Sequence, residues 1–200
     1  MKRVVVIAGA PIDFPVEEMV REDDFIICAD RGWLQAEKHG LVPDMIVGDF
    51  DSSPDPSGRY DNVVILPVEK DDTDTHHIAR YIAGNSYTDV LMAGVTGGRR
   101  IEHTFANIST MLYLAQRGIN ATAVHSSGYM MVICSGKVRL ADRPDSFFSV
   151  FPLGDEARGV SIRGGKYVTD RAVLRNDFPI GVSNEFCGND VEISDRKSVV

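Results

Sequence analysis

The 200-residue sequence contains no apolar run long enough to cross a bilayer, so we expect no membrane-spanning segment. It also lacks an excess of positive charge, because 21 Lys and Arg stand against 29 Asp and Glu and the formal net charge is −8. Nucleic-acid affinity depends on phosphate neutralisation by Lys and Arg, so no nucleic-acid partner is expected. Any phosphate ligand must therefore be met by local basic side chains or by a metal ion.

Cysteine is scarce, and the standard nucleotide-binding fingerprints are missing. The three cysteines, Cys28, Cys134 and Cys187, are far apart and form no C-x-x-C motif. Cys28 and Cys134 lie in apolar runs, which suits small buried side chains in a reducing cytoplasm, so we expect a cytoplasmic protein. Neither G-x-x-x-x-G-K-[ST] nor G-x-G-x-x-G occurs, so by motif the chain is neither a P-loop protein nor a dinucleotide-binding protein.

The fold class follows from a change of periodicity near residue 120. Before it, short Val- and Ile-rich runs alternate with helical patterns, which predicts a mostly parallel α/β sheet. After it, short apolar runs are divided by turn-forming residues, which is typical of an antiparallel β-sandwich. The expected strands of this second part include 121–124 and 129–134. We therefore expect an α/β domain over residues 1–122 and a β-sandwich domain over residues 123–200.

The most informative stretch is Asp44-Met-Ile-Val-Gly-Asp-Phe-Asp-Ser52. A buried strand is expected to end at Gly48, directly before Asp49 and Asp51. If the chain stays extended, both carboxylates point to the same side, where two like charges need a cation or a proton between them. Mg²⁺ binds one or two carboxylates together with substrate phosphates. A solvated acidic turn is the alternative reading of the same residues.

Four predicted strands are followed by charged or glycine-rich segments, which hold Asp30 and Arg31, Asp49 and Asp51, Lys70 to Asp74, and Gly94 to Arg100. In an α/β sheet, ligands bind beyond the carboxyl ends of the strands, so these segments are expected to meet in one crevice. The segments supply oxygen ligands of the kind that metals prefer, basic groups that hold phosphate, and a glycine turn before a helix N-terminus, where anions bind. Together they predict a phosphoryl-transfer site. The oxygen ligands are Asp49, Asp51, Asp71, Asp72 and Asp74, the basic groups are Lys70, Arg99 and Arg100, and the glycine turn is 94–98.

Three histidines lie beside the candidate motifs. His76 and His77 are adjacent on a predicted helix, where neighbouring side chains diverge, and no further ligand recurs four residues away, so a zinc site is disfavoured. His103 stands beside Glu102 at the start of the helix that follows the glycine turn. It is a candidate functional residue, and a capping or core histidine is the alternative.

Taken together, four motifs give the sequence a family resemblance. Gly48-Asp-Phe-Asp-Ser52, Lys70-Asp-Asp-Thr-Asp74, Gly94-x-x-Gly-Gly-Arg99 leading to Glu102-His103 and Asn107, and Ser183-Asn-Glu-Phe186 resemble the thiamine pyrophosphokinase family in order and spacing. The resemblance implies an enzyme that moves the diphosphoryl group of ATP onto the hydroxyethyl oxygen of thiamine and releases AMP. It also implies an α/β catalytic domain, a C-terminal β-sandwich, and a homodimer in which thiamine lies between one subunit's catalytic domain and the other's sandwich.

The resemblance also assigns roles to individual residues. It implies Mg²⁺ ligands, neighbours of the metal and phosphates, ATP-binding residues, and thiamine-binding residues of which the last two come from the partner subunit. The implied Mg²⁺ ligands are Asp49, Asp51 and Asp74, and the neighbours of the metal and phosphates are Asp71 and Thr73. The implied ATP-binding residues are Asp30, Lys70, Gly97, Gly98, Arg99, Arg100 and His103. The implied thiamine-binding residues are Glu102, Ser183 and Asn184.

Two departures from the family pattern leave alternatives open. Arg31 replaces a glycine after the second strand, and the segment from Gly97 to His103 is one residue longer, with Glu102 in place of Asp. Whether Arg99 or Arg100 contacts phosphate is therefore open. One rival is a metal-dependent phosphatase of the haloacid dehalogenase type, whose nucleophile motif Asp49-Phe-Asp51 imitates, although that family places the motif after its first strand. The other is a protein that binds thiamine or a nucleotide without turnover.

Overall fold

The computed structural model describes residues 2–51 and 53–199 of the chain. The chain divides into two compact units, Met1–Met131 and Val132–Val200. This division comes later in the chain than the expected one at 122/123, because the hairpin that follows residue 122 belongs to the first unit. Among the described residues, no helix combines the length and the hydrophobicity that crossing a bilayer requires.

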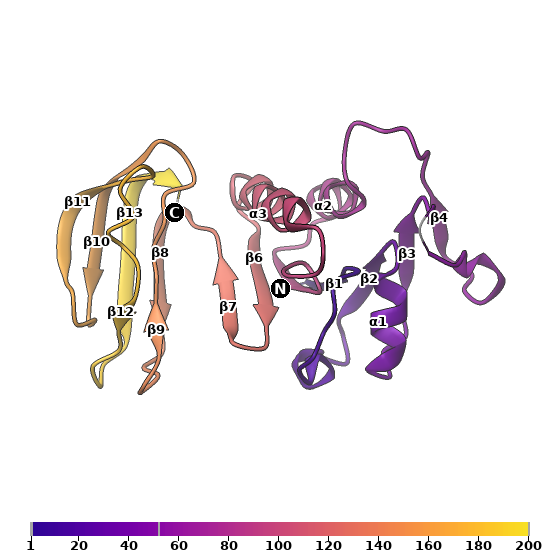
Figure 1. Cartoon of the computed structure of the whole chain (residues 1–200), viewed down its shortest axis with the longest axis horizontal. Helices are drawn as coiled ribbons and strands as arrows, with labels where there is room; N and C mark the ends of the chain where they lie inside the picture. The colour runs from indigo at the N-terminus through magenta and orange to yellow at the C-terminus, as the bar shows by residue number, and fades with distance from the viewer. Residues whose placement is uncertain (1, 52, 200) are drawn as a thin grey trace. The chain divides into compact units, whose positions relative to one another are not determined.

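The first unit is built on a seven-stranded sheet with the order β4-β3-β2-β1-β5-β6-β7 (Figure 1). Every neighbouring pair in it is parallel except β6 and β7. The predicted mostly parallel α/β sheet is thus confirmed. Its strands are β1 (Arg3–Ile7), β2 (Phe25–Ala29), β3 (Met45–Gly48), β4 (Val63–Ile65), β5 (Asp89–Ala93), β6 (Asn120–His125) and β7 (Gly128–Met131).

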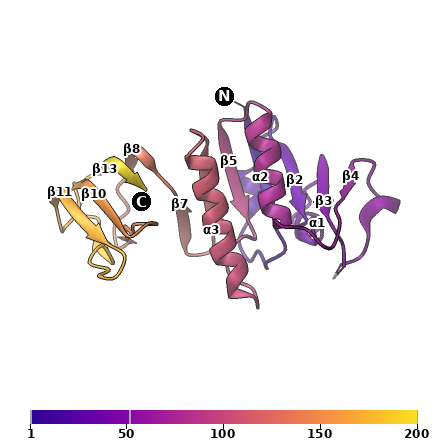
Figure 2. The same ribbon diagram turned by 90° about the horizontal axis from the view of Figure 1, so that it is seen from above.

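Helices cover both faces of this sheet, which explains why its central strands are apolar throughout. The helices are α1 (Gly32–Lys38), α2 (Asp74–Gly84) and α3 (Ile101–Ala115), with 3-10 turns η1 (Val16–Met19) and η2 (Pro56–Gly58). α2 and α3 lie side by side over the sheet (Figure 2). Right-handed connections place α1 on the opposite face. There Trp33 and Ala36 of α1 pack in one core cluster with Val5 and Ile7 of β1.

The chain reverses its direction of travel across the sheet between β1 and β5. From β1 it adds β2, β3 and β4 on one side, and it then returns to place β5, β6 and β7 on the other. At such a switch point the loops after two adjacent parallel strands diverge and leave a crevice at their carboxyl ends. The loops after β1 and β5 are therefore the expected borders of a ligand site.

Two expected strands of the C-terminal domain belong instead to the first sheet. Residues 121–124 lie in β6, which pairs in parallel with β5, and the run 129–134 is interrupted after Met131. Short apolar strands look alike in the sequence whether their neighbours are parallel or antiparallel. The assignment of these strands to the β-sandwich domain was therefore wrong, because pairing with β5 is a long-range event that local periodicity does not encode.

The second unit consists of antiparallel β-sheets, as predicted. One sheet has the order β11-β10-β13-β8, and a two-stranded sheet pairs β12 with β9. The strands are β8 (Cys134–Leu140), β9 (Phe147–Phe148), β10 (Glu156–Arg163), β11 (Thr169–Arg175), β12 (Asn184–Glu185) and β13 (Val191–Val199). Val160, Ile162, Leu174, Val191 and Ile193 supply buried apolar side chains to this unit.

One ion pair fixes the start of β1 to the loop before β2. Arg3 donates from Nε to Asp24 Oδ1 at 2.8 Å and from Nη2 to Asp24 Oδ2 at 2.5 Å. The backbone N–H of Arg21 donates to the same carboxylate at 2.7 Å. Burial by itself raises the pKa of Asp24, but these hydrogen bonds outweigh it and hold the pKa below its usual value.

We predict that Asp24→Asn lowers the free energy of unfolding at pH 7 by about 1–2 kcal/mol, since the Asp24 side chain is only 1% exposed. Because the folded pKa is depressed, the difference from the parent is full above the ordinary aspartate pKa and disappears as the pH falls through the folded value. Urea unfolding between pH 7 and pH 2.5 measures it. Asp23→Asn, at the exposed neighbour, is the matched control, and equal effects of the two changes would refute the assignment.

Candidate functional site

Glycines let the ends of the first three strands approach closely. A Cβ at Gly32 would lie 2.0 Å from the backbone oxygen of Ile7, and one at Gly48 would lie 2.8 Å from Cα of Asp30. Neither backbone position can yield easily, so these contacts require glycine. They bring the carboxyl ends of β1, β2 and β3 together and set Asp30 beside the segment that follows Gly48.

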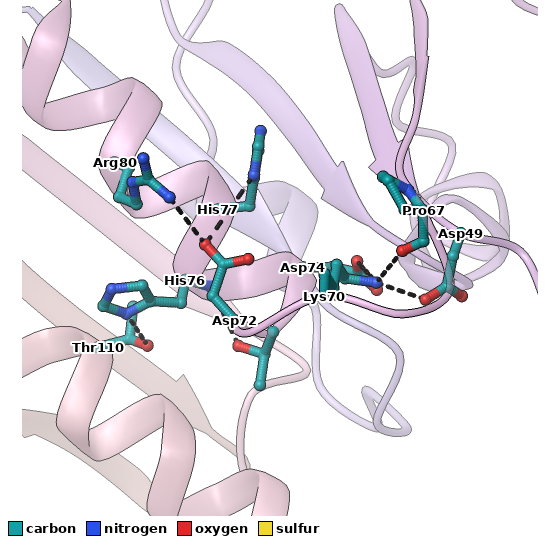
Figure 3. Close-up of polar contacts among 10 residues, drawn as sticks. Asp49, Pro67, Lys70, Asp72, Asp74, His76, His77, Arg80 and Thr110 are labelled. Carbon is teal, nitrogen blue, oxygen red and sulfur yellow. Dashed lines mark hydrogen bonds and ion pairs between the residues drawn. The ribbon is translucent and has the colours of Figure 1, made fainter.

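Lys70 joins two carboxylates from different strand ends. Its ammonium contacts Asp49, which follows β3, and lies 3.1 Å from Oδ1 of Asp74 at the start of α2 (Figure 3). It also donates to the carbonyl of Pro67 at 3.3 Å. The predicted meeting of Asp49, Lys70 and Asp74 is thus present in the structure, and these two carboxylates flank a single positive charge.

The pKa values of Asp74, Asp49 and Lys70 reflect burial and the charges that these three side chains place next to one another. Burial raises the pKa of Asp74, and the negative charges of Asp49 and Asp30 add to this rise, so that Lys70 offsets it only in part. Oδ1 of Asp74 is buried and has no hydrogen-bond partner among the described residues, and Lys70 lies within ion-pair distance of it. The hydrogen bond from Lys70 lowers the pKa of Asp49. Burial lowers the pKa of Lys70, but its two carboxylate partners outweigh burial and raise it.

The Asp49-Phe-Asp51 segment is a turn rather than a continuation of the strand. β3 ends at Gly48, Phe50 has a positive φ of 53°, and the backbone N–H of Asp51 donates to Asp49 Oδ1 at 3.3 Å. The expectation that both carboxylates align through extended geometry was therefore wrong, because the left-handed residue breaks the alternation. Asp51 is exposed, and Ser52 of the same motif lies outside the described residues.

The residues of the second acidic motif point in different directions (Figure 3). Asp72 faces Arg80 Nη1 at 3.3 Å and His77 Nδ1 at 4.0 Å, away from Lys70. Thr73 caps α2 by accepting a hydrogen bond from the backbone N–H of His76 at 3.2 Å. Asp71 is exposed, with no side-chain hydrogen bond or ion pair to any described residue. Asp72 therefore pairs with side chains of α2 and does not join Asp49 and Asp74, with which the sequence pattern groups it as a metal-type ligand.

The two adjacent histidines diverge, as expected. Nδ1 of His76 lies 3.2 Å from Oγ1 of Thr110 on α3, and its ring packs against Tyr113, whereas His77 faces Asp72. Within residues 2–51 and 53–195, no three His, Cys, Asp or Glu side chains lie close enough together to hold a metal ion. Asp49 and Asp74 nevertheless fit Mg²⁺, which takes one or two carboxylates and completes its shell with phosphate and water.

The loop after β5 leaves the same carboxyl edge of the parallel sheet as the segment after β3. Gly94, Gly97 and Gly98 all have positive φ, and a Cβ at Gly94 would meet the carbonyl oxygen of Ala8 at 2.3 Å. This glycine loop, residues 94–98, therefore packs against the chain leaving β1. The amide of Asn107 on α3 donates to the carbonyl of Val95 at 2.7 Å and holds the loop from behind. The loop leads into the N-terminus of a 15-residue helix, which favours a bound anion.

The two arginines beside this loop differ in their surroundings. Arg100 donates from Nε to Glu102 Oε1 at 2.7 Å, and both side chains are exposed. Arg99 and His103 are exposed and have no side-chain hydrogen bond or ion pair among the described residues. Arg99 therefore has the guanidinium that is free for an anion, while Glu102 is turned toward Arg100.

In the second unit, the two predicted thiamine-side residues have unequal roles. Ser183 is exposed, with a positive φ of 58°, and its backbone N–H donates to Ser149 Oγ at 3.0 Å. Asn184 is only 5% exposed, and its amide accepts from Tyr167 N at 2.9 Å and donates to Tyr167 O at 2.7 Å. Asn184 therefore fixes the backbone of Tyr167.

Tyr167 is a candidate that the sequence interpretation missed. The residue is 62% exposed although its backbone is held at both polar atoms, and Nζ of Lys166 lies 5.7 Å from the ring centre. An exposed aromatic ring on a fixed backbone provides a stacking surface for a flat ligand. The sequence signal was weak, because Tyr167 follows Gly164-Gly165-Lys166 without an apolar repeat, and its link to Asn184 spans 17 residues.

Comparison with known families shows which protein family the chain belongs to. Residues 16–123 match the family described as thiamin pyrophosphokinase, catalytic domain, and residues 137–200 match thiamin pyrophosphokinase, vitamin B1 binding domain. The chain belongs to the thiamin pyrophosphokinase family. It therefore carries the ATP-using kinase domain and the thiamine-binding domain of that family, as the four motifs predicted.

Solved structures agree with this family in fold. The thiamine pyrophosphokinase from Bacillus subtilis superposes with a TM-score of 0.89 at 20% identity, over 99% of this chain and 96% of that chain. The enzymes from Geobacillus thermodenitrificans and Candida albicans give TM-scores of 0.85 and 0.83 at 21% and 17% identity, covering 98% and 99% of this chain and 94% and 87% of theirs. A comparison with curated protein sequences gave no significant match.

Family membership removes the support for a phosphatase. The Asp49-Phe-Asp51 turn follows β3, which lies next to the edge strand β4, and not the central strand β1.

Proposed function

We propose that this protein transfers the diphosphoryl group of ATP to thiamine with the help of Mg²⁺, releasing AMP. The observation that carries the proposal is the joining of Asp49 and Asp74 through Lys70 at the carboxyl edge of a catalytic domain of this family. Two carboxylates around one positive charge, at the same sheet edge as a glycine loop with a free arginine, suit a magnesium–triphosphate substrate. Mg²⁺ bound there would neutralise phosphate charge, with Asp49 and Asp74 as its ligands. Asp51 lies in the same turn as Asp49.

The reaction balances as a substitution at the β-phosphorus. The hydroxyethyl oxygen of thiamine forms a bond to the β-phosphorus. At the same time, the bond between the β-phosphorus and the oxygen that bridges it to the α-phosphorus breaks. That bridging oxygen leaves as part of AMP, and the hydroxyl proton is lost. Asp71, exposed and unpaired among the described residues, is the carboxylate that we assign to receive the proton.

The remaining residues hold the two substrates. Arg99 and the glycine loop bind the phosphates, because the guanidinium of Arg99 is free whereas that of Arg100 is paired with Glu102. Lys70 retains its charge and moves from between the carboxylates to the phosphate oxygens. Asp30, which accepts from Ser53 Oγ at 2.7 Å, and Thr73, which caps α2, position these groups. Gly97, Gly98 and His103 complete the ATP side.

Thiamine is assigned to Ser183, Asn184 and Tyr167 of the second unit, with Glu102 on the catalytic side. We propose that the second unit of one subunit serves the catalytic unit of its partner in a homodimer, as the family resemblance implies. The thiazolium ring carries a positive charge, and an aromatic face such as that of Tyr167 attracts such a cation.

The decisive experiment is analysis of the nucleotide product. Incubation with ATP, Mg²⁺ and thiamine is expected to give AMP and thiamine diphosphate in equal amounts, with no ADP above the background without enzyme. Omitting Mg²⁺ or adding EDTA is expected to abolish turnover. Formation of ADP would overturn diphosphoryl transfer, and ligand binding without any product would favour the non-catalytic alternative.

A further inference from the structure

His76 links the helix that carries Asp74 to the helix that follows the glycine loop. It lies in the first turn of α2, and its Nδ1 lies 3.2 Å from Oγ1 of Thr110 on α3 (Figure 3). The two helices pack side by side over the sheet (Figure 2). The proposed chemistry assigns no role to this contact.

The direction of the hydrogen bond follows from the second bond that Thr110 makes. Oγ1 of Thr110 donates its single proton to the carbonyl of Ala106 at 3.0 Å, so toward His76 it acts as an acceptor. Nδ1 of His76 is therefore the donor. Thr110 is 1% exposed, so water does not readily replace this donor when it is removed.

The ring of His76 adds a packing contact to the hydrogen bond. It meets the ring of Tyr113 edge to face, with 4.7 Å between the ring centres. Thr110 and Tyr113 are three residues apart on α3 and therefore lie on the same face of that helix. The hydrogen bond and the ring contact together set the first turn of α2 against α3.

The same residue fixes the turn that presents Asp74. The backbone N–H of His76 donates to Oγ1 of Thr73, the capping residue, at 3.2 Å, and Asp74 is the first residue of the helix. Asp74 thus lies in a turn that His76 holds at two points, through its backbone to Thr73 and through its side chain to α3.

Asp74 depends on this support once phosphate is bound. Its Oδ1 lies 3.1 Å from Nζ of Lys70, but in the proposed function this ammonium moves to the phosphate oxygens. The position of the carboxylate is then set by the backbone of α2. α3 is a suitable reference for it, because Asn107, one turn before Thr110, holds the glycine loop through the carbonyl of Val95.

We propose that His76 is a positioning residue, whose hydrogen bond to Thr110 fixes the Asp74 carboxylate relative to the glycine loop. The proposal rests on the proposed function, in which Asp74 is a ligand of Mg²⁺. His76 needs to touch neither the metal nor the substrates, because it acts through Asp74.

The test measures how much Mg²⁺ strengthens nucleotide binding, without turnover. Calorimetry with α,β-methylene-ATP, in which the bond to be broken is blocked, gives one dissociation constant with Mg²⁺ and one with EDTA, and we call their ratio the metal effect. His76→Phe keeps a ring against Tyr113 but removes the donor. It is expected to reduce the metal effect about five- to tenfold and to change metal-free binding by less than about twofold. His76→Asn places an amide N–H near the position of Nδ1 and is expected to recover most of the loss.

Three further variants show whether the effect runs through the proposed contact. Thr110→Val removes the acceptor with little change of shape and is expected to reproduce the effect of His76→Phe. His77→Phe, on the next residue of α2 and facing Asp72, is the matched control and is expected to keep the metal effect of the parent. Asp74→Asn combined with His76→Phe is expected to bind no more weakly than Asp74→Asn alone, because the two changes act on one carboxylate.

An unchanged metal effect in His76→Phe and Thr110→Val would overturn the proposal. Equal weakening with and without Mg²⁺, or no recovery in His76→Asn, would also overturn it. A metal effect that is lost in Asp74→Asn but kept in His76→Phe would refute this proposal alone, whereas one that Asp74→Asn retains would refute the metal assignment of the proposed function as well. If His76→Phe does not fold, Thr110→Val and His76→Asn decide the question.

Discussion

Asp74→Asn is expected to lower kcat by about a thousandfold or more while the protein stays folded. The change removes one of the two negative charges that flank Lys70, in the buried position where the pKa of the carboxyl is already raised. With one carboxylate lost, Mg²⁺ loses half of its proposed protein ligands, and the ammonium of Lys70 stays bound to Asp49. Single-turnover AMP formation at saturating ATP and thiamine measures the effect.

Asp72→Asn is the matched control for this prediction. It makes the same chemical change two residues away, where the carboxylate faces Arg80 and His77 on α2. We expect its kcat within about threefold of the parent, because exposed ion pairs contribute little. Circular dichroism and thermal unfolding of both variants verify folding. Near-normal turnover of Asp74→Asn, or an equal loss in both variants, would refute the metal assignment.

Asn184→Ala is expected to raise the KM for thiamine about ten- to hundredfold and to change the KM for ATP by less than about twofold. The substitution removes the hydrogen bonds that fix the backbone of Tyr167, so the exposed ring is no longer held in place. Initial rates with each substrate varied in turn measure the two constants. Asn189→Ala, at an exposed asparagine of the same unit, is the control, and equal effects on ATP and thiamine would contradict the division of the site.

Asn184→Ala, combined with Asp74→Asn, also tests the shared-site homodimer. Asp74→Asn and Asn184→Ala proteins are each expected to be nearly inactive at low thiamine, whereas in the shared-site model a heterodimer of the two has one site with both changes and one site with neither. After dissociation and random reassociation, about a quarter of the parent activity is expected to return if each site uses two subunits. No recovery, or a fully active monomer in sedimentation, would refute the shared site.

The sequence alone determined the order of the elements and the chemistry of the segments between them. Gly48, Pro67 and Gly94 mark strand ends, and acidic and glycine-rich residues follow them, which are local properties that a reader of the chain can find. The fold class and the family followed from those patterns, and both were confirmed.

Tertiary structure decided which of these residues meet. Only the folded chain shows that Lys70 lies between Asp49 and Asp74, that Asp72 turns to Arg80, and that Asn184 holds Tyr167. It also places β6 and β7 in the first sheet. Phe50 adopts a left-handed backbone conformation that the alternating pattern did not predict. The physical reason is common to all of them. Contacts over long chain separations and the backbone conformation of a single turn residue depend on packing against the rest of the molecule, whereas strand and helix periodicity depends only on near neighbours.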